Sequence, residues 1–133
     1  MRGFFIVFMC LSIWLFTSTS RSYAETQAEM TDEACLVLRN SNVEMKNVLK
    51  MIINHHQDNK RFIAALRKSQ RVWSVFRDAE LNTVYPESPD RYGSSYGMCR
   101  CTVLNELTRE RIEKLNKWLT EGTEGDVCAG SMK

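Results

Sequence analysis

The longest uninterrupted helical pattern constrains this chain most. No proline or glycine occurs between Ala28 and about Asp58, and the apolar residues recur with the period of an α-helix. Six of them share one helical arc: Ala34, Leu38, Met45, Val48, Leu49 and Ile52. The stretch therefore predicts a long amphipathic helix with one face to bury.

Two more helices are expected after it, from about Lys60 to Val84 and from about Cys99 to Thr120. Both prolines lie in the segment YPESPDRYGSSYGM, which must end the second helix. The apolar residues expected to face inward are Phe62, Leu66, Trp73 and Phe76 on the second helix and Leu104, Leu115, Trp118 and Leu119 on the third. We expect an all-α fold, a long antiparallel hairpin plus a third helix.

The first 24 residues have the pattern of a secretory signal: a basic start, an apolar run and small residues before a cleavage site after Ala24. The apolar run from Gly3 to Phe16 has 14 residues, fewer than the roughly 20 that span a bilayer. The prediction is a signal peptide over 1–24 and one helical domain over 25–133, periplasmic or secreted, with no stable membrane insertion after cleavage.

Cysteine use agrees with export, because four cysteines remain after the signal: Cys35, Cys99, Cys101 and Cys128. Side chains two residues apart on a helix point about 200° apart, so Cys99 and Cys101 should not bond each other. In an up-down-up arrangement Cys35 can reach either of them. We expect two disulfides, Cys35 with one of this pair and Cys128 with the other. The CRC spacing is too short for a usual zinc site, so no metal is expected.

Several polar residues lie beside the apolar faces of the second and third helices. By helical angle, Arg77 and Arg111 point inward, and Glu80 is the nearest acidic partner for Arg77. Arg67, Arg71 and Asp78 fall on the solvent side. The predicted structural polar core consists of Gln70, Trp73, Arg77, Glu80, Thr108 and Arg111.

Four blocks of sequence carry a resemblance to a known family. TQAEM followed by Cys35, then LRKSQRVWSVFRDAE, YGSSYGMC and LTRERIEKL resemble the LprI-like exported helical domains, over about Thr26 to Lys133. Many members have a cysteine after the RDAE block, where this chain has Leu81, so their disulfide pattern does not transfer. Cys128 is a possible substitute.

The resemblance implies inhibition of a lysozyme by an envelope protein. A lysozyme cleft holds two carboxylates, and the long connection from Asn82 to Met98 is the element expected to reach it. Its predicted contact residues are Tyr85, Arg91, Tyr92, Ser94, Ser95 and Tyr96. The alternatives are a connector that binds nothing, and a non-enzymatic docking module for another envelope protein or a peptidoglycan-related ligand.

Other function classes find little support in the sequence. Without Arg2 and Arg21 the 18 basic residues become 16, equal to the 16 acidic ones, and nucleic-acid binding usually needs a basic excess. No catalytic triad order, phosphate loop or metal-spaced cluster occurs. We expect no catalytic residues and no cofactor, and a protein partner, possibly a lysozyme.

Overall fold

The computed structural model describes residues 18–120 and 127–132. Three α-helices make up most of this part of the chain: α2 (Ser18–His55), α3 (Lys60–Val84) and α4 (Tyr96–Asn116). Two 3₁₀-helices accompany them, η1 (Pro89–Tyr92) and η2 (Gly130–Met132), and the described residues contain no strand. The predicted all-α class is confirmed. The first 17 residues of the expected signal lie outside the described part, and its cleavage site falls within α2.

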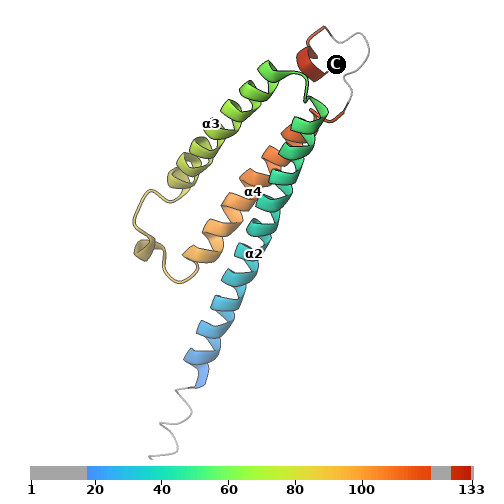
Figure 1. Ribbon diagram of the computed structural model, residues 1–133. Helices are drawn as coiled ribbons and strands as arrows, with labels where there is room; N and C mark the ends of the chain where they lie inside the picture. The colour runs from blue at the N-terminus through green and yellow to red at the C-terminus, as the bar shows by residue number, and fades with distance from the viewer. Residues whose placement is uncertain (1–17, 121–126, 133) are drawn as a thin grey trace, which may run out of the picture.

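Helices α2 and α4 run parallel and side by side, and α3 runs back between their ends (Figure 1). The α2–α4 contact supplies the most deeply buried side chains of the protein, with Ile52, Ile112 and Leu115 at most 1% exposed. A hydrogen bond from Ser41 Oγ to Asn105 Oδ1, 2.7 Å long, and an ion pair between Arg109 and Glu44 also join the two helices. The closest pair is thus the parallel one, rather than the antiparallel hairpin of α2 and α3.

Helix α3 contacts this pair mainly near its two ends. The Asn59 side chain caps its start by accepting a hydrogen bond from the Phe62 backbone, 3.0 Å long. Phe62, Ile63 and Leu66 then enter the common core, and the next buried residue is Leu81. Residues 67–80 are exposed or only half-buried. The prediction that Phe76 faces inward is wrong, because its side chain is 52% exposed; α3 diverges from the α2–α4 pair here, and the pair does not cover that face.

The helix boundaries match the sequence pattern best at α3, which has the predicted ends. Helix α4 begins at Tyr96, three residues before the predicted start, and ends at Asn116 rather than about Thr120. The connection between α3 and α4 is therefore 85–95, shorter than the predicted 82–98. Gly97 lies against α2, where a Cβ would come within 3.0 Å of Thr31 Cγ2. This close approach brings the first turn of α4 onto α2.

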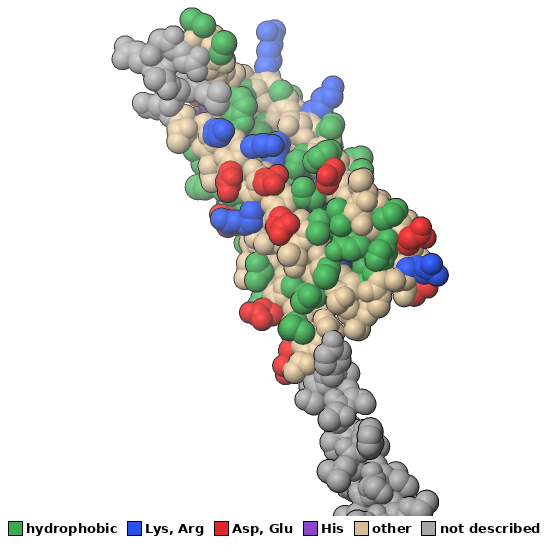
Figure 2. Space-filling view, turned by 180° about the vertical axis from the view of Figure 1, so that it is seen from behind, with side chains coloured by type: hydrophobic (Ala, Val, Ile, Leu, Met, Phe, Trp, Pro, Cys, Tyr) green, Lys and Arg blue, Asp and Glu red, His purple; other side chains and the backbone are tan. Residues whose placement is uncertain are grey.

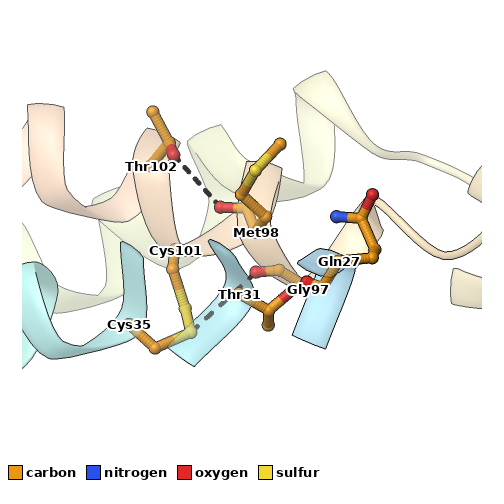
Figure 3. Close-up of a disulfide and its surroundings, with 7 residues drawn as sticks. All are labelled: Gln27, Thr31, Cys35, Gly97, Met98, Cys101 and Thr102. Carbon is orange, nitrogen blue, oxygen red and sulfur yellow. Dashed lines mark hydrogen bonds between the residues drawn. A yellow bond between two sulfur atoms is a disulfide. The ribbon is translucent and has the colours of Figure 1, made fainter. Parts of the chain in front are cut away.

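A disulfide between Cys35 and Cys101 links α2 to α4 beside this contact, with Cα atoms 5.0 Å apart (Figure 3). It confirms that Cys35 pairs with one of the two CRC cysteines. The second predicted bridge is wrong: among the described residues, no disulfide joins Cys99 to Cys128. Cys99 lies in the first turn of α4, whereas residues 127–132 lie beyond the other end of that helix (Figure 1). Residues 127–132 therefore do not lie beside the first turn of α4.

Candidate functional site

The 85–95 connection is shaped by its own backbone. Tyr85 ends α3 through a hydrogen bond from its N–H to the Leu81 carbonyl, 2.9 Å long. Pro89 starts η1, where its fixed φ is favourable. Gly93 follows with φ of 72°, a left-handed conformation that glycine adopts without strain. These three positions bend the chain sharply from α3 into α4.

Three tyrosines pack against one another under this bend. The ring centroid of Tyr85 lies 5.1 Å from that of Tyr92 and 5.4 Å from that of Tyr96, both edge to face. Tyr92 and Tyr96 stack at 5.7 Å. The Tyr92 hydroxyl also accepts a hydrogen bond from the Glu87 backbone N–H at 2.8 Å. Contacts of this kind order the connection before binding. A flexible connection would instead lose conformational entropy when it bound a partner.

Two groups of the connection have shifted pKa values. Burial raises the pKa of the Tyr85 hydroxyl, and the neighbouring Cys99 thiol raises it further. The Ser88 hydroxyl, by hydrogen bonding to the Asp90 carboxylate, lowers the pKa of that group. Tyr85 therefore stays a neutral packing residue at neutral pH, and Asp90 stays charged.

The connection presents its charged and small polar side chains outward. Arg91 and Ser94 are exposed, as are Glu87 and Asp90, whereas Ser95 is half-buried at the start of α4. Figure 2 shows hydrophobic side chains gathered near this end of the molecule, with acidic and basic side chains at their margin. The structure thus brings all six predicted contact residues into one region, but it turns the three tyrosines mainly toward each other.

A second cluster lies between the middle of α3 and the last turns of α4, where the polar core was predicted. The Arg111 guanidinium donates through Nε to Gln70 Oε1 at 3.1 Å and through Nη2 to Ser69 Oγ at 3.0 Å. The guanidinium carbons of Arg77 and Arg111 lie 5.3 and 5.9 Å from the Trp73 ring centroid. Burial lowers the pKa of Arg111. This cluster links α3 to α4 where apolar packing between them is sparse.

The predicted partners within this cluster need correction. Arg77 pairs with Asp78 at 3.0 Å, not with Glu80, because its guanidinium lies over the Trp73 ring, where the neighbouring carboxylate is within reach. The Thr108 hydroxyl is buried but bonds to the Leu104 carbonyl of its own helix at 2.7 Å. Sequence reasoning missed Ser69, which it had no reason to place inward. It placed Met45 on the inward face of the first helix, but not its contact with Gln70, whose Nε2 donates to the Met45 sulfur at 3.4 Å.

The described residues hold no group of three or more histidine, cysteine or acidic side chains placed to bind a metal ion. The same part of the chain has no helix that is both long and apolar enough to cross a membrane.

Comparison with known families completes this description. A family model described as "Lysozyme inhibitor LprI" matches residues 18–115, which include α2, α3, the connection and nearly all of α4. The chain belongs to the LprI family. No curated protein and no solved structure matched. The match stops at Leu115, so the tail that carries Cys128 lies beyond it, although the resemblance in the sequence was expected to extend to Lys133.

Proposed function

We propose that this protein is a non-enzymatic inhibitor that binds a lysozyme-type enzyme through the 85–95 connection, in the periplasm or outside the cell. Membership of the LprI family supports inhibition of a lysozyme as the general role. The observation that carries the choice of surface is the tyrosine cluster, which holds the connection in one shape while Arg91 and Ser94 face solvent.

The chemistry of the connection suits an acidic cleft. Lysozyme-type enzymes place two carboxylates on either side of the sugar bond that they cleave. The Arg91 guanidinium would donate charge-assisted hydrogen bonds to them, and the Ser94 hydroxyl would both donate and accept. Because the tyrosines already order the backbone, little conformational entropy remains to be lost on binding.

The surroundings of Arg91 give the surface both signs of charge. Glu87 and Asp90 flank it on the same connection and are exposed. An enzyme with basic residues around an acidic cleft would meet carboxylates at the rim and a guanidinium at the centre. Such complementarity favours a correct orientation and fast association more than it raises affinity.

A lysis assay tests the proposal. Purified protein is titrated against several lysozyme classes acting on bacterial cells, alongside the variants Arg91→Ala and Arg67→Ala. Arg67 is an exposed arginine in α3, so it matches the charge change at a distance from the connection. We expect protection at near-stoichiometric ratios with the original protein and with Arg67→Ala, and inhibition weaker by about tenfold or more with Arg91→Ala.

Two results would contradict the proposal in different ways. Protection that is equal for Arg91→Ala and Arg67→Ala would place the inhibitory surface elsewhere. Absence of protection against every lysozyme class would favour the alternative, a docking module for another envelope protein or a peptidoglycan-related ligand.

A further inference from the structure

A groove lies between α3 and the end of α4, at the opposite end of α3 from the 85–95 connection. Its volume is about 640 Å³, and the residues that matter for its chemistry are Arg61, Phe62, Ser69, Arg111, Trp118 and Ser131. Arg61 and Ser69 are eight residues apart on α3, so the groove extends about 12 Å along this helix at 1.5 Å per residue. The proposed lysozyme-binding surface uses none of these residues.

The groove is positively charged. The described residues that line it include Arg61 and Arg111 and no aspartate or glutamate. Neither arginine forms an ion pair with any residue in the described part of the chain. The hydrogen-bond partners of Arg111 are Gln70 and Ser69, which are neutral, and the guanidinium is half-buried. A partly desolvated cation with only neutral partners favours an anion beside it.

One wall of the groove is aromatic and held in place. Trp118 is half-buried, and its ring centroid lies 5.1 Å from that of Phe62, which in turn lies 4.2 Å from the His56 ring. His56 Nε2 is also 3.1 Å from the Trp118 carbonyl oxygen, at hydrogen-bonding distance. These contacts fix the position of Trp118 just after α4. An aromatic surface of this kind packs against the flat apolar face of a ligand.

We propose that this groove binds a small anionic saccharide, with its acid group between Arg61 and Arg111 so that both guanidinium groups contribute, and with the apolar face of its sugar ring on Trp118. Ser69 and Ser131, together with Asn59, line the same groove and supply hydroxyl and amide groups for the sugar hydroxyls. Polar groups that lie beside apolar and aromatic side chains are typical of small-molecule sites. The acid is a carboxylate or a phosphate, since a guanidinium accepts either.

The test uses three sugars that share one ring. The purified protein is titrated with N-acetylmuramic acid, with N-acetylglucosamine 6-phosphate and with N-acetylglucosamine, while NMR follows the Arg111 Nε–H and the Trp118 indole N–H. We expect at least one of the two acidic sugars to shift both signals with saturation, and the neutral sugar to bind about tenfold more weakly or not at all. The stronger of the two acidic sugars identifies the acid.

Arg61→Gln and Arg67→Gln form the matched pair of variants. Both arginines are exposed on α3, but Arg67 lines a different groove, on the side that faces α2. We expect Arg61→Gln to weaken binding of the acidic sugar about tenfold and Arg67→Gln to leave it unchanged. In the part of the chain that the structure describes, the exposed Arg61 side chain forms no hydrogen bond or ion pair, so its substitution should not unfold the protein.

Several outcomes would overturn the inference. The first is equal binding of the acidic and neutral sugars. The second is an equal effect of Arg61→Gln and Arg67→Gln on binding. The third is the absence of any NMR shift with either acidic sugar at millimolar concentration. Binding that emerges only after Glu121, Glu124 and Asp126 are changed to their amides would assign the groove to the acidic tail of this chain instead. Lysozyme inhibition does not depend on the groove, so the lysis assay with Arg61→Gln separates failure here from failure of the proposed function.

Discussion

The α2–α4 pair and helix α3 are held in different ways. Between α2 and α4 the contacts are apolar and deep, centred on Ile52, Ile112 and Leu115, and a disulfide joins the two helices. From residue 67 to residue 80, α3 has no buried side chain and meets α4 through Arg111, Gln70 and Trp73. Burial of apolar area stabilises the α2–α4 pair, whereas hydrogen bonds and cation–π contacts hold residues 67–80 of α3 against α4.

This difference in packing indicates that the middle of α3 carries residues for roles other than filling the hydrophobic core. The block QRVWSVFRDAE, one of the most specific parts of the resemblance, occupies residues 70–80, within the sparsely packed part of α3. A block needed only for the hydrophobic core would be expected where burial is deepest. Its polar residues instead set the position of α3, and α3 carries one side of both the groove and the 85–95 connection.

The largest effect should come from the disulfide. Changing Cys35 and Cys101 to serine opens a loop with a sequence separation of 66 residues, which in the chain-entropy model lowers the free energy of unfolding by about 4 kcal/mol. Urea unfolding followed by circular dichroism measures it, and Cys99→Ser is the control with an expected change below about 0.5 kcal/mol. A loss below about 1 kcal/mol would mean that apolar contacts alone hold the pair together.

Ile112→Ala should cause the second largest loss of stability. The side chain is 1% exposed, and truncation of such a residue costs about 3 kcal/mol through lost burial and the cavity that remains. Val75→Ala, on the part of α3 with sparse packing, is 72% exposed and should change stability by less than about 0.5 kcal/mol. Similar losses for the two variants would show that α3 is packed in solution more closely than its exposure indicates.

Arg111→Ala should lower the free energy of unfolding by less than Ile112→Ala does, by about 1 to 2 kcal/mol. It removes two hydrogen bonds to neutral partners and the cation–π contact with Trp73. Arg71→Ala, on the solvent side, should leave the melting temperature unchanged. If the arginine variants at 71 and 111 shift the melting temperature equally, the cluster does not hold α3.

Tyr92→Phe should have the smallest effect. It removes the hydrogen bond to the Glu87 N–H but keeps the ring contacts with Tyr85 and Tyr96. We expect the free energy of unfolding to change by less than about 1 kcal/mol, with faster hydrogen exchange of the Glu87 amide in NMR. Exchange that stays slow would show that the rings alone order the connection, whereas Tyr92→Ala should loosen it further and weaken inhibition.

The positions of the helices could be predicted well because their signals are local. Asn59 and the residues around it set the start of α3, and Pro86 and Pro89 prevent its continuation. The same signals located the connection and its six candidate residues. They could not show that the tyrosines face one another, since ring contacts between Tyr85 and Tyr96 depend on how α3 and α4 meet.

The sequence by itself determined an all-α chain, the ends of α3, and that Cys35 pairs with one cysteine of CRC. The first two follow from periodicity and helix-breaking residues, and the third from the expected up-down-up order of the helices together with the geometry that separates Cys99 from Cys101. Only the tertiary structure decided that α2 packs closest to α4, that Cys101 is the partner of Cys35, and that Arg77 turns to Asp78. These outcomes depend on which faces of separate helices approach each other, and helical periodicity gives the direction of a side chain without giving what it meets.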